Sequence, residues 1–125
     1  MKHVRLSLLV LLAFTVAAIS ARAADATIEG TLVDSKCYLG GGETGNDHGA
    51  MKECGTMCLK GGTPAAVLTK DKKFHAISAP SIALAPYVGQ QVRVTGPVTN
   101  GTILAKTVAV NKGGKWEEVK LGAMM

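Results

Sequence analysis

The clearest periodic pattern in the sequence is an alternation in "ATIEGTLVDS" (residues 26–35), where Ile28, Gly30 and Leu32 alternate with more polar neighbours. A period of two is typical of a strand with one buried face. The alternation stops after this stretch, and residues 39–63 are rich in Gly, Asn and Asp without any period. We therefore predict a first strand followed by a long loop, and a loop of this length in a compact domain is usually functional or disordered.

The second half of the chain predicts four further strands. Two short apolar runs flank "KDKK" (residues 70–73), which has the composition of a hairpin turn. The stretch "APSIALAPYVG" (residues 79–89) contains two prolines, so we expect a one-turn helix or a loop there. Residues 90–110 then predict two paired strands, because Asn100 and Gly101 form a strong hairpin signal.

The order of these elements predicts the fold class. It runs strand, long loop, two strands, short connector and two strands, and "KWEEVKL" (residues 115–121) adds an edge strand that carries Trp116. This order matches the OB-fold, a five-stranded, partly open barrel; a small sandwich is the alternative. We predict a mainly β protein, a small five-stranded OB-like barrel with a long Cys/His-containing loop after its first strand.

The N-terminus has the layout of a secretory signal peptide. Lys2 and Arg5 form a basic head, residues 6–19 are almost purely apolar, and "ARA" (residues 21–23) offers small residues two positions apart. These are the three regions of a signal peptide with an A-x-A cleavage site. The apolar run is shorter than the roughly 20 residues of a membrane span. We therefore predict a signal peptide over residues 1–23 and a periplasmic or secreted protein.

Removal of the signal peptide changes the charge of the chain. The full sequence has 14 Lys and Arg against 9 Asp and Glu, but Lys2, Arg5 and Arg22 belong to the leader. Residues 24–125 keep 11 basic and 9 acidic side chains, a net charge of +2. They have no basic stripe with interleaved aromatics, which argues against nucleic-acid binding. We expect one small OB-like domain over residues 24–125, without membrane attachment after cleavage.

The long loop concentrates residues that bind soft metals. Cys37, His48, Cys54 and Cys58 are separated by ten, five and three residues. Three thiols and one imidazole are a complete Cys₃His set of the kind that binds structural zinc. Thiolates, thioethers and imidazole also suit Cu(I), and Met51 offers a thioether within the same loop. If residues 54–58 are helical, both of their thiols lie on one helix face. We predict a soft-metal site, copper before zinc, from these five side chains.

Two other interpretations of the cysteines remain open. Three cysteines in an exported chain cannot all pair within it, but a disulfide from Cys37 to Cys54 or Cys58 would fasten the loop. The protein would then be a binding or interaction module whose stapled loop borders the OB-fold ligand face. Thiol–disulfide chemistry at the C-x-x-x-C pair is the other interpretation, although the C-x-x-C of thioredoxin-type proteins is absent.

The multipart motif resembles that of a group of small exported bacterial proteins without an assigned reaction. "VDSKCYLG" is followed by a histidine, then by two cysteines three residues apart, and then by "KGGTP". A further stretch, "PYVGQQVRVTGPV", looks like the second half of secreted OB-fold-like domains. The resemblance covers most of residues 28–110. It implies export, an OB-like domain and a common role for the Cys/His set.

No catalytic motif accompanies this set. The chain has no G-x-S-x-G and no H-E-x-x-H, so the sequence argues against an enzyme rather than for one. Asp34, Glu43, Asp47 and Glu53 offer outer hydrogen-bond acceptors for a metal ligand, while a solvated loop face explains them as well. The leading hypothesis is a periplasmic metal carrier whose partners are a metal ion and a periplasmic protein.

Overall fold

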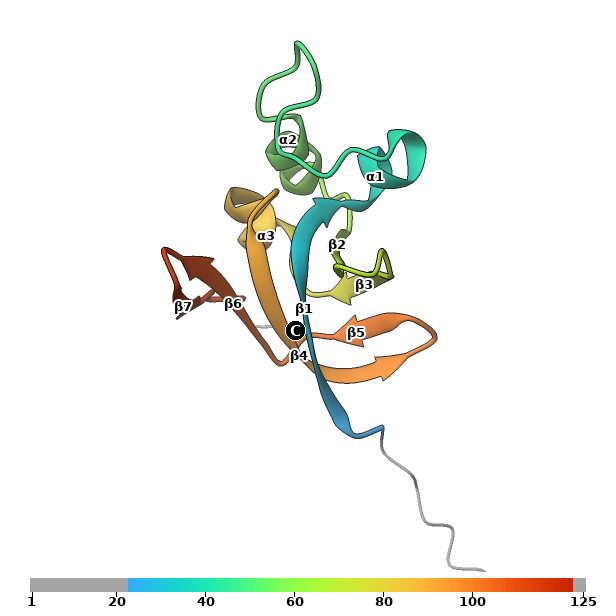
Figure 1. Ribbon diagram of the computed structural model, residues 1–125, viewed down its shortest axis with the longest axis vertical. Helices are drawn as coiled ribbons and strands as arrows, with labels where there is room; N and C mark the ends of the chain where they lie inside the picture. The colour runs from blue at the N-terminus through green and yellow to red at the C-terminus, as the bar shows by residue number, and fades with distance from the viewer. Residues whose placement is uncertain (1–22, 123–125) are drawn as a thin grey trace, which may run out of the picture.

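The computed structural model describes residues 23–122, so all but the last residue of the predicted signal peptide lies outside it. Figure 1 shows the arrangement of the elements. In chain order they are β1 (Asp25–Asp34), α1 (Ser35–Gly41), α2 (Cys54–Lys60), β2 (Ala65–Leu68), β3 (Phe74–Ser78), α3 (Ser81–Leu84), the 3-10 turn η1 (Ala85–Tyr87), β4 (Gln91–Thr99), β5 (Thr102–Leu104), β6 (Thr107–Lys112) and β7 (Lys115–Glu118).

Five of the strands close into a barrel. They follow the order β1-β2-β3-β5-β4, and β1 pairs with β4 to complete the circle. The β3–β5 pair is parallel and the other pairs are antiparallel. The helical connector α3–η1 lies between the third and fourth strands, where the sequence predicts it. The predicted mainly β fold with a five-stranded barrel is therefore confirmed, and β6 and β7 extend its sheet.

A glycine allows β1 to take part in two strand pairs. Its first part pairs with β4 and its second part with β2, and Thr31 lies opposite both Gln91 and Leu68. A Cβ atom on Gly30 would lie 2.2 Å from the carbonyl oxygen of Leu68. Only glycine permits this approach, as is common at barrel corners. The barrel closure therefore requires a glycine at position 30, within the alternating positions Ile28, Gly30 and Leu32.

The predicted strand after the Asn100–Gly101 turn is split into β5 and β6. Val98 lies opposite Ile103, whereas Thr95 lies opposite Thr107. Three positions along β4 therefore match four positions along the partner, which is a one-residue β-bulge. Both pieces pair with β4, but only β5 also contacts β3 in the barrel.

The core fills the barrel and continues under the helices. Its buried members come from every barrel strand and from the helical segments: Leu32, Leu59, Ala65, Val67, Ile77, Leu84, Ala85, Val88, Val92, Val94, Ile103, Ala105, Val108, Val110 and Val119. Leu59 of α2 and Leu84 of α3 are fully buried. The helical connection after β1 is therefore attached to the barrel through the core itself.

The connection after β1 contains two short helices, where the sequence predicts an aperiodic loop. Each of α1 and α2 has seven residues, too few to show a helical hydrophobic period. The buried residues of α2 include Gly55 and Thr56, which carry no apolar signal. Among residues 23–122, no helix is long and apolar enough to cross a membrane.

Candidate metal centre

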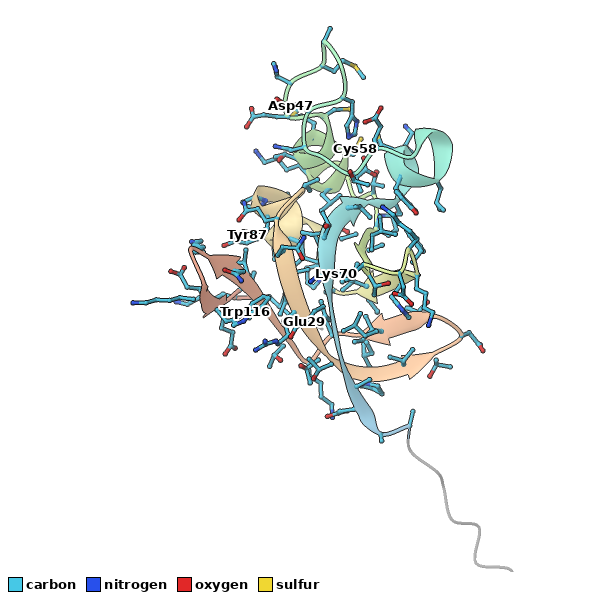
Figure 2. All side chains as sticks on the ribbon, in the orientation of Figure 1. Glu29, Asp47, Cys58, Lys70, Tyr87 and Trp116 are labelled. Atoms are coloured by element: carbon cyan, nitrogen blue, oxygen red, sulfur yellow. The ribbon has the colours of Figure 1, made fainter. Side chains whose placement is uncertain are left out.

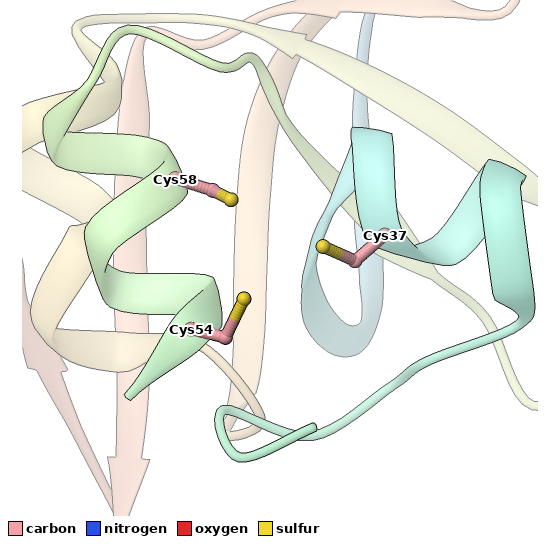
Figure 3. Close-up of side chains that lie close together, drawn as sticks. All are labelled: Cys37, Cys54 and Cys58. Atoms are coloured by element: carbon pink, nitrogen blue, oxygen red, sulfur yellow. The ribbon is translucent and has the colours of Figure 1, made fainter. Parts of the chain in front are cut away.

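The three cysteines converge between α1 and α2. The sulfur atoms of Cys37, Cys54 and Cys58 all lie within 4.8 Å of one another, and all three side chains are partly buried. Figure 3 shows Cys54 and Cys58 on one side of α2, directed toward Cys37 on α1. Sulfurs bound to one ion at about 2.3 Å lie about 4 Å apart. The three thiols are therefore close enough to bind a single metal ion.

No disulfide links these cysteines, and all three are free thiols. The stapled loop, considered as an alternative from the sequence, is thus not present in this structure. The helix considered for the C-x-x-x-C pair is present, because α2 begins at Cys54 and includes Cys58.

Helix α1 holds Cys37 through contacts at both of its ends. Asp34 caps its start, since Oδ1 accepts hydrogen bonds from the backbone N–H groups of Lys36 at 2.9 Å and Cys37 at 3.4 Å. The ring of Tyr38 stacks on that of Phe74 in β3, with centroids 5.6 Å apart. Gly42 ends the helix in the left-handed conformation and donates its N–H to the Tyr38 carbonyl. Cys37 is therefore fixed relative to the barrel by its neighbours on either side.

Helix α2 is held by an asparagine from the preceding loop. The Asn46 carbonyl accepts the N–H of Gly55 at 3.0 Å, and its side-chain Oδ1 accepts the N–H of Thr56 at 2.8 Å. The Thr56 hydroxyl lies 2.9 Å from the same Oδ1 and 3.0 Å from the Ala85 carbonyl. These contacts satisfy N–H groups that a helix start leaves free.

The opposite side of α2 packs closely against the connector. A Cβ atom on Gly55 would lie 2.6 Å from Cγ1 of Val88, and Leu59 is fully buried. Because this side is pressed against the core, the side that carries Cys54 and Cys58 is directed toward α1.

His48 is not a member of the three-sulfur group. Its ring is largely buried, and Nε2 lies 3.0 Å from the Gly45 carbonyl, within hydrogen-bond distance. Its backbone exchanges two hydrogen bonds with Met51, at 2.9 and 3.0 Å, which forms a tight turn. The structure thus gathers three of the four expected Cys₃His residues.

Both methionines of the connection are largely exposed. Met51, the thioether predicted as a ligand, is 61% exposed, and Met57 is 64% exposed. Neither side chain contributes to the buried core. An exposed Met51 is available to solvent at the tip of the turn that it forms with His48.

Asp34 is a buried acidic residue beside the thiols. Only 2% of Asp34 is exposed, and its Oδ2 has no well-formed hydrogen bond. The sequence placed it among four acidic neighbours of the cysteines without distinguishing it from the others. Its position at the end of a strand and directly before a helix is the signal that could have singled it out as a cap.

Asp34 favours the protonated form of the neighbouring thiols. The Asp34 carboxylate raises the pKa of Cys37 well above the ordinary value, first because an acceptor beside the thiol favours its protonated form; burial and the negative charge of Asp34 add to this effect. Burial raises the pKa of Cys58, and the same carboxylate acts in the same direction. Reactive cysteines have a lowered pKa, so the direction of these two shifts does not favour the thiol–disulfide interpretation.

A separate hollow of about 730 Å³ lies beside the barrel. It is lined by residues of β1, the β2–β3 turn and β6–β7, among them Glu29, Lys70 and Trp116. Figure 2 labels these three near the strands and Cys58 near the helical end. The hollow contains no cysteine or histidine, so it and the three-sulfur group are different features.

Comparisons with known proteins find no matching family, no matching curated protein and no matching solved structure. The class of site is therefore defined by its geometry. It is a three-cysteine group, able to bind a metal ion, on two short helices at one end of a mainly β barrel.

Proposed function

We propose that the protein is an exported carrier or buffer of a soft metal ion, Cu(I) before Zn²⁺. The observation that supports it best is the convergence of three thiols from two helices, within 4.8 Å of one another. Soft thiolate ligands favour Cu(I) and Zn²⁺ over hard cations.

The number of sulfurs in the group supports the preference for Cu(I) over Zn²⁺. Structural zinc sites have four protein ligands, and His48 lies outside the group that the three sulfurs form. Cu(I) is a soft ion that thiolate ligands select, and its lower charge makes three thiolate donors sufficient. A three-sulfur site therefore suits Cu(I) without a fourth protein ligand.

The proposed location rests on the sequence of residues 1–23. A basic head, an apolar run and an A-x-A site support export. Free thiols in an oxidising compartment need a reason to be kept, and metal binding supplies one. The resemblance to small exported bacterial proteins supports the same location and a common role for the cysteines.

Metal content and free thiols, measured together, test the proposal. We expect the mature, reduced protein to bind one Cu(I) per chain in competition with a Cu(I)-specific chelator under anaerobic conditions. Cys37→Ser, Cys54→Ser and Cys58→Ser should each lower the affinity about 100-fold or more, by analogy with the loss of a metal ligand or its support. Thr44→Ser, which introduces serine at an exposed position, serves as the matched control and should leave the Cu(I) affinity unchanged.

The disulfide remains the second candidate, since three sulfurs this close are also near enough for pairing after a small movement. A protein isolated from its own compartment with one stoichiometric disulfide, and without Cu(I) uptake after reduction, would contradict the metal carrier and support the stapled module.

A further inference from the structure

The three-sulfur group has a buried carboxylate as its neighbour. The backbone N–H of Cys37 donates a hydrogen bond to Asp34 Oδ1 at 3.4 Å, and only 2% of Asp34 is exposed. Asp34 is thus a buried neighbour of Cys37, which supplies one of the three thiols.

Little in the surroundings neutralises this carboxylate. Oδ1 receives two backbone N–H groups, but Oδ2 is buried without a well-formed hydrogen bond. Among the described residues, the salt bridges join five other pairs of side chains and none includes Asp34. A buried carboxylate that no cationic side chain pairs with interacts strongly with other charges nearby, because little solvent screens it.

When Cu(I) binds, the three thiols become thiolates, so the occupied site carries a net negative charge beside Asp34. Three thiolates and one Cu(I) carry a net charge of −2, and an ionised Asp34 adds one more negative charge to the same partly buried region. With Zn²⁺ the three-thiolate complex carries only −1, so its repulsion from the carboxylate is smaller. The cost of the neighbouring carboxylate is therefore greatest for the monovalent ion.

We propose that Asp34 lowers the affinity of the three-cysteine site for Cu(I), so that the ion stays exchangeable and the protein acts as a carrier rather than a permanent sink. This inference rests on the proposed function. Asp34 does not belong to the group of ligand atoms that lie within 4.8 Å of one another, so it acts on the bound ion through its charge.

Asp34→Asn tests the inference with little structural change. Asparagine is as good an N-cap as aspartate, so it keeps the bonds to Lys36 and Cys37 while it removes the charge. Asp34→Ser is a second uncharged cap, to be used if the asparagine variant fails to fold. Asp47→Asn is the matched control, because Asp47 lies at the same end of the molecule (Figure 2) and its Oδ1 accepts the N–H of Glu53 at 2.8 Å.

The readout is the affinity for Cu(I) and for Zn²⁺, each measured by chelator competition with reduced protein. We expect Asp34→Asn to raise Cu(I) affinity about tenfold, the size of effect that one nearby like charge has on an ionised group, and to raise Zn²⁺ affinity less. Asp47→Asn should change neither affinity. Melting of the metal-free variants by circular dichroism checks that the fold is kept.

An unchanged or lowered Cu(I) affinity in a folded Asp34 variant would overturn the inference, and a loss for both ions would instead make Asp34 a ligand or a structural support. An equal gain for both ions would overturn it as well, because the charge argument requires a difference. If the wild-type protein binds no Cu(I), the proposed function itself fails. If the wild type binds Cu(I) and the Asp34 variant binds it with equal affinity, only the inference about Asp34 fails.

Discussion

Asn46 accepts the backbone N–H of Thr56 at 2.8 Å, although ten residues separate the two in the chain. The contact ties the loop that contains His48 to the helix that carries Cys54 and Cys58. It also explains how a helix of only seven residues is maintained, since the isolated peptide would be too short to be stable in water.

We therefore expect Asn46→Ala to destabilise the protein and to weaken the site. The N–H of Thr56 would lose its acceptor in a part-buried position, which costs about 1–3 kcal/mol. Urea unfolding would measure the loss, and Cu(I) affinity should fall because the two thiols of α2 lose their fixed position. Glu43→Ala, at an exposed position of the same connection, is the control. Equal stability of the Asn46 variant and the wild type would show that the cap is dispensable.

Two glycines in the helices should respond oppositely to alanine. At Gly55 a Cβ atom would lie 2.6 Å from Val88 Cγ1, so Gly55→Ala should destabilise the protein by about 1–3 kcal/mol despite the better helix propensity of alanine. At Gly40 in α1 nothing lies within 4 Å of such an atom. Gly40→Ala should therefore stabilise by about 0.5–1 kcal/mol. Thermal melts of both variants measure this, and a Gly55→Ala variant that is more stable than the wild type would contradict the packing of α2.

His48→Ala should affect stability more clearly than metal binding. The ring loses its contact with the Gly45 carbonyl, which should cost about 1 kcal/mol. Because the three sulfurs form their group without this ring, Cu(I) affinity should fall far less than in the cysteine variants. Chelator competition on His48→Ala and Cys58→Ser, measured in parallel, makes the comparison. A loss as large as that of Cys58→Ser would place His48 in the metal-bound site.

The stability of the reduced, metal-free protein should fall at alkaline pH. The pKa of Cys37 is raised in the folded protein, chiefly by Asp34, from an ordinary value of 9.0. A thiol with a raised pKa contributes its full stabilisation below the unfolded value and loses it as the pH increases above that value. The free energy of unfolding should therefore decline above about pH 9, and Cys37→Ser should decline less. Urea unfolding between pH 7 and 10.5 measures both curves; parallel curves would exclude this contribution of Cys37.

The barrel was predictable because its strands follow local patterns. Alternation marked β1, an apolar pair around "KDKK" marked β2 and β3, and Asn100–Gly101 marked the β4–β5 turn. The helices were less accessible, since α2 buries Gly55 and Thr56, whose placement depends on Val88 and Asn46 elsewhere in the chain.

The candidate site likewise has one part that the local sequence predicted and one part that it did not. The spacing of Cys54 and Cys58 is a local property, so a helix was enough to place both thiols on one face. His48 is nearer to Cys54 in sequence than Cys37 is, yet it does not join the group. The turn from His48 to Met51 and the contact with Gly45 fix its ring by bonds that the residue spacing does not indicate.

The sequence by itself determined the mainly β class, the position of the connector and the segment that contains the cysteines, because these depend on local periodicity and turn residues. Only the tertiary structure decided that Cys37 meets Cys54 and Cys58, and that Asp34 is buried beside them. Both facts depend on contacts between residues far apart in the chain, namely the Tyr38–Phe74 stack and the packing of α2 on the core. Long-range contacts of this kind have no signature in the spacing of residues.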